Sequence, residues 1–191
     1  MRNRPTRFDN ISIALHWLVA LSYFGLFGLG AYMVTLGYYD PLYTRLPYWH
    51  KGLGILLIFV VLFRLLWHMI RARPEPGQGH QRYERVGAGI VSWGMTIGLL
   101  IVLMSGYMIT TSAGATIDVL TLFKVPAINF GMENQEDLAG QIHWTVSYLV
   151  LTLAIIHTIA ALKHHFIDRD DTLKRILPGA RPGNLPPADK Q

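Results

Sequence analysis

Cysteine is absent from all 191 residues of this chain. Its absence excludes disulfide bonds, iron–sulfur clusters held by thiolates and the Cys-x-x-Cys-His attachment of a c-type haem. Any redox group in this protein must therefore be held by other ligands.

Charge is also scarce. Charged residues make up 15% of the chain and hydrophobic residues 51%, whereas a soluble domain carries about 25% charge. This composition indicates a membrane protein. The net charge of +5 does not indicate nucleic-acid binding, because the basic residues sort by membrane side, as shown below.

Four apolar stretches are long enough to cross a bilayer, which takes about 20 residues. They predict an all-α integral membrane four-helix bundle in residues 1–178, followed by a polar tail in 179–191. The first stretch is too long for the core of a signal peptide, so we expect it to be retained. The expected spans are residues 11–36, 51–70, 86–111 and 138–163.

The basic residues indicate how the bundle is oriented. Thirteen cations lie in the N-terminal segment, the second connection and the C-terminal segment, against three in the first and third connections. The positive-inside rule then predicts that both termini are cytoplasmic. The three cations on the opposite side are Arg45, Lys51 and Lys124, and the remaining one, Arg64, lies within the second span.

The last span carries histidines at regular spacing. His143 and His157 are fourteen residues apart, which on a helix returns the side chain to within about 40° of the same face and moves it about 21 Å along the axis. His164 follows seven residues later on nearly the same stripe, at the cytoplasmic edge. One face of this helix therefore presents an imidazole in each leaflet.

Two histidines on other spans match these depths. His16 pairs with His157 near the cytoplasmic side, and His50 pairs with His143 near the outer side. Two imidazoles from facing helices at one depth are the axial ligands of a b-type haem. Two such pairs predict two haems b, an inner and an outer one, and a path for electrons across the membrane.

Other interpretations of the histidines stay open. A single intramembrane histidine is often a helix–helix hydrogen bond or part of a proton relay. A metal site without haem lacks an acidic or cysteine cluster at the same depth. His68 returns to the face of His50 but lies near the cytoplasmic end, where snorkelling is expected. His80 lies in a polar loop, and His165 points away from the stripe.

Three further positions are candidates for the chemistry at each end. Arg64 lies at the depth of the inner pair, where a haem propionate would satisfy it, with snorkelling to the cytoplasm as the alternative. Lys51 and Lys124 would attract a small anion such as superoxide, or contact lipid headgroups instead. His164, with Arg71, Arg73 or Lys163 nearby, would hydrogen-bond a quinone and deliver a proton, or would simply be solvated.

The outer connection of residues 112–137 is the longest and least polar one. Its segment "IDVLTLF" predicts a short interfacial helix over the outer haem.

Four motifs carry a resemblance to a known family: "SIALHW", "WHKGLGILLIFVVLFRLLW", "LMSGYMITTSAG" and the closing "IHWTVSYLVLTLAIIHTIAALKHHFIDRDDTLKRILP". The chain resembles the bacterial cytochrome b561 family of small four-helix cytochromes of the inner membrane. That resemblance implies two haems b held by four histidines, which correspond by motif to His16, His50, His143 and His157. It agrees with the pairing by depth.

Within that family the chain most resembles members that act as a superoxide oxidase. The resemblance implies that superoxide is oxidised on the periplasmic side and ubiquinone is reduced. His164 matches the first histidine of a pair near the quinone, whereas the outer connection diverges most from the family pattern. The alternatives are a cytochrome b anchor that takes electrons from a periplasmic dehydrogenase or hydrogenase partner, and a non-enzymatic haem-binding membrane protein.

Overall fold

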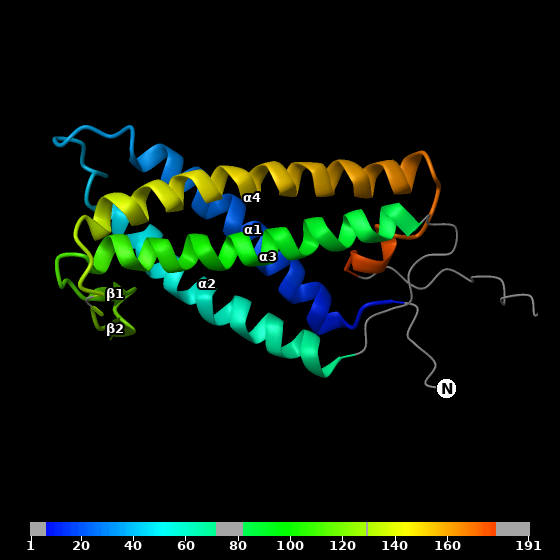
Figure 1. Cartoon of the computed structure of the whole chain (residues 1–191), viewed down its shortest axis with the longest axis horizontal. Coiled ribbons are helices and arrows are strands. Elements are labelled where there is room, and N and C mark those ends of the chain that lie inside the picture. The colour runs from blue at the N-terminus through cyan, green and yellow to red at the C-terminus, as the bar shows by residue number, and fades with distance from the viewer. Residues whose placement is uncertain (1–6, 72–81, 129, 179–191) are drawn as a thin grey trace, which may run out of the picture.

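The computed structural model describes residues 7–71, 82–128 and 130–178 and shows four long helices with a small β-hairpin (Figure 1). All four helices are long and apolar enough to span a membrane. The expected fold class, a membrane four-helix bundle, is confirmed. The elements are α1 (Asn10–Met33), α2 (Arg45–Ile70), α3 (Arg82–Thr111), β1 (Ile117–Val119), β2 (Phe123–Val125), α4 (Gln135–Phe166) and the 3₁₀ turn η1 (Lys174–Ile176).

Three of the helices, α2, α3 and α4, extend beyond the apolar stretches that identify them. The second helix begins at Arg45, six residues before the expected start at Lys51. Pro47 is tolerated there, because the first turn of a helix has no intrahelical partner for its N–H groups. The first helix is shorter than expected and ends at Met33. Hydropathy marks the part of a helix that lies in hydrocarbon, not the turns that project from it.

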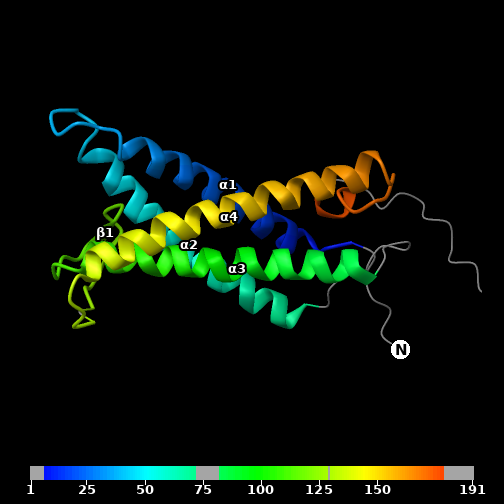
Figure 2. The same cartoon turned by 45° about the horizontal axis from the view of Figure 1, so that its top comes forward.

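The four helices form two pairs. Helices α3 and α4 run side by side along their length, and α1 packs with α2, whereas α4 stands off from α1 and α2 over most of its length (Figures 1 and 2). Close packing of α3 on α4 depends on Gly98, because a Cβ there would lie 2.5 Å from Cγ2 of Val150. Small residues allow such close approach of membrane helices.

The bundle has two distinct ends. Residue 7 and residue 178 lie at the same end, which we call the terminal end; the end that carries the β-hairpin is the hairpin end (Figure 1). An even number of spans requires this arrangement. That the terminal end faces the cytoplasm stays a prediction of the charge distribution.

The hairpin corrects one expectation. The segment "IDVLTLF" is not an interfacial helix: β1 pairs antiparallel with β2, with Ile117 opposite Val125 and Val119 opposite Phe123. Ile117 and Val119 are buried while Asp118 between them is exposed, which is the period of two of a strand. Tyr107 of α3 anchors the following segment, because its hydroxyl donates to the Pro126 carbonyl at 2.8 Å.

The terminal end is closed by polar contacts between distant segments. The Asp9 carboxylate caps α1 by accepting from Ser12 N at 3.1 Å, and it also accepts from Trp67 Nε1 of α2 at 3.1 Å. Trp17 Nε1 donates to the Ile176 carbonyl at 2.9 Å. The segment after α4 is thereby held against the start of α1.

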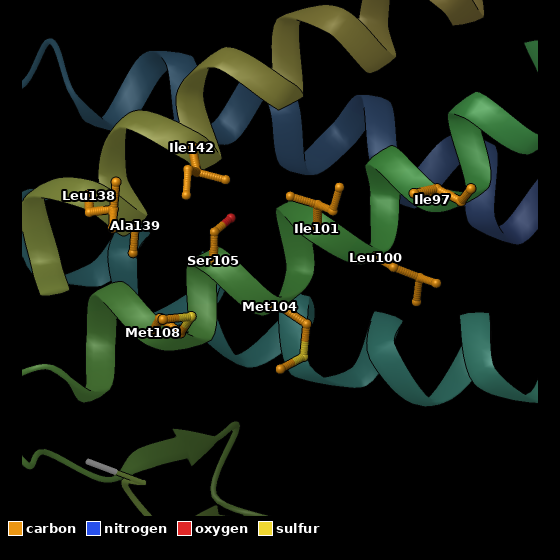
Figure 3. A pocket seen from close by; sticks show the side chains of 9 residues that line it. All are labelled: Ile97, Leu100, Ile101, Met104, Ser105, Met108, Leu138, Ala139 and Ile142. Carbon is orange, nitrogen blue, oxygen red and sulfur yellow. The ribbon is translucent and has the colours of Figure 1, made fainter. Parts of the chain in front are cut away.

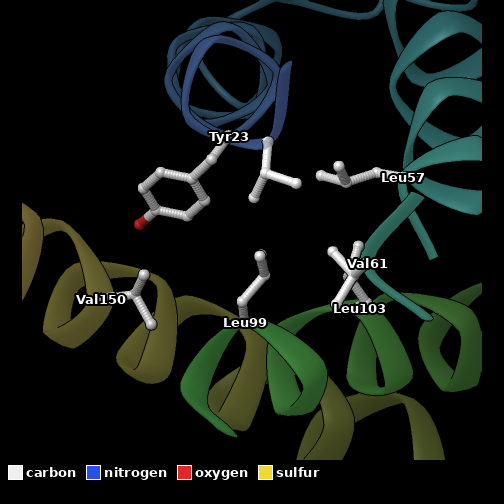
Figure 4. Packing of buried hydrophobic residues seen from close by; sticks show 7 residues of the cluster. Tyr23, Leu57, Val61, Leu99, Leu103 and Val150 are labelled. Atoms are coloured by element: carbon white, nitrogen blue, oxygen red, sulfur yellow. The ribbon is translucent and has the colours of Figure 1, made fainter. Parts of the chain in front are cut away.

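The middle of the bundle is a dry apolar belt to which all four helices contribute (Figure 4). Its best-buried member is Val61, which is 1% exposed. The belt lies between the hairpin end and the terminal end. Its buried residues are Val19, Tyr23, Leu57, Val61, Leu99, Leu103 and Val150.

Candidate functional site

At the hairpin end, two of the predicted histidines face each other. His50 comes from the second turn of α2 and His143 from the third turn of α4, and their ring centroids lie 6.2 Å apart with planes inclined by 74°. A metal ion bonded to one nitrogen of each ring at about 2.0–2.1 Å would hold two such centroids about 6 Å apart. The spacing therefore fits axial ligation of one iron by both imidazoles.

The protonation of His143 also suits a ligand. Its Nδ1 lies 2.9 Å from the Val102 carbonyl of α3, with Ser105 Oγ at 3.3 Å. A carbonyl only accepts hydrogen bonds, so this contact assigns the ring proton to Nδ1 and leaves the Nε2 lone pair for a metal. Helix α3, which supplies no predicted ligand, thus orients one.

Two glycines lie against these rings. A Cβ on Gly30 would be 3.1 Å from His50 Cε1, and a Cβ on Gly106 would be 3.0 Å from His143 Cε1. Nδ1 of His50 is buried and makes no well-formed hydrogen bond. The backbone of Leu26 lies close enough to interact with the imidazole. Gly54, one turn after His50, is half-buried beside open space.

At the terminal end, the other pair forms a basic cluster. His16 of α1 lies within electrostatic range of His157 of α4, and of Arg64 and His68 of α2. The positive charge of Arg64 also interacts electrostatically with His157. The predicted inner pair and the predicted arginine are thus brought together, with His68 as an additional neighbour. Two imidazoles beside a cation suit a metal ligand set that also binds an anionic group.

Arg64 has an unsatisfied donor inside the bundle. Its Nε is buried and makes no hydrogen bond to any of the residues that the structure describes. A buried guanidinium without an anion is costly, and a carboxylate would satisfy it through charge-assisted bonds. Together with the paired imidazoles, this orphaned donor fits a haem with its propionates.

His164 lies in a charged network at the terminal end. Its Nδ1 is 2.8 Å from the Asp168 carboxylate and 3.6 Å from that of Asp170. Lys163, one of its predicted neighbours, contacts Asp168 at 2.8 Å and Glu84 of α3 at 3.5 Å. The hydrogen bond from Lys163 outweighs slight desolvation and lowers the pKa of Asp168 below its ordinary value. The carboxylates of Glu84, Asp168 and Asp170 were missed because each lies just outside an expected span, where hydropathy does not indicate which side chains meet.

Two further residues, Arg71 and Arg73, were predicted near His164. The Arg71 guanidinium stacks on the Trp67 ring, 4.9 Å from its centroid. Arg73 and His80 lie outside the described residues. Donor atoms of Glu84, His164 and Asp168 lie within 4.8 Å of one another, a grouping able to hold a metal ion. Because the Lys163 ammonium contacts both of these carboxylates, it already supplies a cation there.

The two candidate lysines differ in their surroundings. Lys51 is exposed, follows His50 directly and acts on it electrostatically. Lys124 lies on β2 opposite Asp118, and their charged atoms are 3.7 Å apart. Both members of this pair are largely exposed, so the attraction is weak, yet it reduces the positive potential that Lys124 presents.

A shallow apolar groove of about 310 Å³ lies between α3 and α4 (Figure 3). Its one polar side chain is Ser105, whose hydroxyl donates to the Val102 carbonyl. The groove is the kind of surface that lipid chains cover. It is lined by Ile97, Leu100, Ile101, Met104, Ser105, Met108, Leu138, Ala139 and Ile142.

Comparison with known proteins places these features in a family. The family model for prokaryotic cytochrome b561 matches residues 7–179. The chain is also 42% identical over 175 residues to the protein named cytochrome b561 homolog 2 of Escherichia coli (strain K12), an alignment that covers 92% of this chain and 93% of that relative.

Proposed function

Because the chain belongs to the prokaryotic cytochrome b561 family, membrane electron-transfer proteins that bind b-type haem, we propose that it carries electrons across the membrane through two such haems. With its four spans, it is a multi-pass protein of the bacterial inner membrane. In this proposal, electrons come from superoxide at the hairpin end and reach ubiquinone at the terminal end.

The observation that carries the proposal is the pair of histidines at each end of the bundle. His50 and His143 face each other at 6.2 Å, and His16 and His157 lie in one electrostatic cluster. The two members on α4 are fourteen residues apart, about 21 Å along the axis. Two sites at this separation divide the passage across the membrane into shorter electron-transfer steps.

Each side chain has a specific role in this proposal. A b-type haem, when bound, supplies reversible one-electron chemistry. His50 and His143 would hold the outer haem, and His16 and His157 the inner one. Val102 and Ser105 orient His143, which fixes the direction of its free nitrogen. Arg64 would neutralise a propionate beside the inner pair.

Superoxide is proposed as the donor because it is a small anion that gives up one electron. Lys51 is exposed directly beside His50 and would raise the local concentration of anions at that end. Two superoxide ions would yield two O₂ and deliver two electrons. One ubiquinone would take up both electrons together with two protons and leave as the quinol.

The terminal end would supply the protons for that product. His164 Nδ1 lies 2.8 Å from the Asp168 carboxylate, so in the imidazolium form the ring would hold its Nε2–H in place as a general acid towards a quinone oxygen. The Asp168 pKa is held below its ordinary value, first by the hydrogen bond from Lys163. Asp168 therefore remains a carboxylate at neutral pH and orients His164 instead of donating the proton itself.

A second candidate is an anchor cytochrome that takes electrons from a periplasmic protein. Lys124 is opposed by Asp118, which weakens the case for a small anionic donor. Large side chains are also exposed at the hairpin end: Tyr39 is 96% exposed and Leu122 is 70% exposed. An exposed apolar surface of this kind is typical of protein–protein contact.

Stopped-flow spectroscopy of the purified oxidised protein separates these candidates. A pulse of superoxide should reduce the haem within the dead time or shortly after it, and ubiquinone should then reoxidise it. Haem quantitation on the same sample should give two haems per chain. If dithionite reduces the haems but superoxide does not, the role in electron transfer would stand. The electron donor would then be the partner protein of the alternative proposal. One haem or none would contradict the two-haem proposal.

A further inference from the structure

Tyr23 lies midway between the two histidine pairs. It follows His16 by seven residues and precedes Gly30, which lies against His50, by seven more. Seven residues bring a helix back to within about 20° of the same face, so these three positions form one stripe of α1. Tyr23 is buried within the apolar belt, 7% exposed.

Helix α4 repeats this spacing with His143, Val150 and His157. Tyr23 and Val150 belong to the same buried cluster, in which the phenol ring extends from α1 towards α4 (Figure 4). The two stripes therefore face each other in three layers. His16 and His157 form the layer at the terminal end, and Tyr23 with Val150 forms the middle one. At the hairpin end, Gly30 and His143 both lie beside His50 of α2.

The Tyr23 hydroxyl connects the two helices directly. It donates to the Ser147 carbonyl of α4 at 2.6 Å, and Ser147 Oγ donates to the His143 carbonyl at 2.6 Å. Beside it, Phe27 of α1 meets Tyr148 of α4 edge to face, with centroids 5.1 Å apart. Since α4 otherwise stands off from α1, these contacts determine how far apart the two helices lie at mid-bundle.

We propose that Tyr23 is a positioning residue that couples the two haem sites: its ring fills the gap between them, and its hydroxyl fixes α4 against α1. This inference rests on the proposed function, because it needs a haem at each pair. The other buried members of the belt are aliphatic, and the π orbitals of a ring mediate electronic coupling better than saturated carbon does. One electron leaves the outer site and one arrives at the inner site, while Tyr23 keeps its own electrons and its phenol proton.

The test compares Tyr23→Phe and Tyr23→Leu with the wild-type protein in membranes or detergent. A laser-driven photoreductant bound at the hairpin end injects one electron, and the spectrum follows its passage to the second haem without quinone. We expect Tyr23→Phe, which keeps the ring, to retain most of the rate. Tyr23→Leu should slow the transfer clearly while haem content and both midpoint potentials stay unchanged, a result that a merely structural role would not produce.

Phe24→Leu is the matched control, because Phe24 is the neighbouring aromatic residue and is 45% exposed on the lipid side. It should transfer electrons at the wild-type rate. A Tyr23→Leu protein with two haems and an unchanged rate would overturn the proposal. If that variant loses a haem, Tyr23→Met, which fills more of the space, takes its place; a wild-type rate in that two-haem variant would equally overturn it.

A second readout does not depend on electron-transfer rate. In the infrared difference spectrum between reduced and oxidised protein, we expect a phenol C–O band that disappears in Tyr23→Phe, because Tyr23 would sense the charge of both sites. Absence of that band in the wild type would contradict the coupling role. A wild-type protein with fewer than two haems would instead refute the proposed function, and the inference with it.

Discussion

Gly30 lies directly against the His50 ring: a Cβ added to this glycine would be 3.1 Å from Cε1 of the imidazole. The two residues come from different helices, α1 and α2, so the fit between them determines where the His50 ring can lie. Gly106 has the same relationship to His143, at 3.0 Å. Each imidazole at the hairpin end thus lies between a glycine and the other imidazole.

Gly30→Ala should displace His50 by a few tenths of an ångström. We expect the outer haem to remain bound but to change its electron paramagnetic resonance g values and its midpoint potential, since both depend on axial ligand geometry. Gly28→Ala is the matched control, because a Cβ there meets no atom within 4 Å. Identical spectra for the two variants would show that the close contact does not constrain the ligand.

Removing either histidine of a pair should remove the haem from that site and leave the other haem bound. His50→Ala should leave only the inner haem, and His16→Ala only the outer one, because a porphyrin iron of this type needs both axial imidazoles. Pyridine haemochrome quantitation per chain measures this directly. His165→Ala, a histidine beside Phe166 at the helix end, should retain both haems. Two haems in either of the first variants would mean that the pairing is wrong.

Arg64→Gln should lower the midpoint potential of the inner haem. A positive charge disfavours the oxidised iron, and a unit charge about 10 Å away at an effective dielectric constant of about 20 amounts to about 1.7 kcal/mol, or roughly 70 mV for one electron. Arg64→Lys, which keeps the charge, should shift the potential less. Redox titration followed at the haem absorbance measures both variants, and an unchanged potential in Arg64→Gln would place the guanidinium away from the haem.

His164→Ala should slow the reoxidation of the reduced protein by ubiquinone, by about 100-fold if the imidazole is the general acid. Asp168→Asn should have a smaller effect, because it removes only the carboxylate that orients the ring at 2.8 Å. Reduction of the haems by the electron donor should stay at the wild-type rate in both. Wild-type reoxidation in His164→Ala would remove this residue from the quinone site.

The stability contributed by Asp9 should depend on pH. Its slight burial raises the pKa, but hydrogen bonds from Ser12 and Trp67 outweigh that and lower the pKa below the ordinary 3.8. A lowered carboxyl pKa gives stability that is present above pH 3.8 and is lost as the pH falls through the value in the folded protein. Thermal unfolding should therefore show an acid-side decrease in stability that is smaller in Asp9→Asn than in the wild type.

At neutral pH, Asp9→Ala should lower the free energy of unfolding by about 0.5–2 kcal/mol, the usual cost of losing an N-cap. Asp9→Asn should lose less, since asparagine also caps helices. Equal losses in the two variants would assign the effect to the charge of the carboxylate instead of to the cap.

The sequence by itself determined the four spans, because hydrocarbon requires long apolar helices and nothing else satisfies their backbone. It also predicted the two histidine pairs, since the depth of each histidine depends on its spacing along its own helix. In the structure, the ring spacing of His50 and His143 fits that pairing. Their role as haem ligands stays a prediction for the haem measurements above.

Only the tertiary structure decided which side chains support these pairs. That Gly30 meets His50, that Val102 orients His143 and that Tyr23 bonds to Ser147 are contacts between different helices. Helix rotation and separation arise from packing, as at Gly98 and Val150, and the periodicity of a single helix contains no information about its neighbour. The hairpin of residues 117–125 was decided in the same way, because a short apolar run suits a strand or a helix until its partner is known.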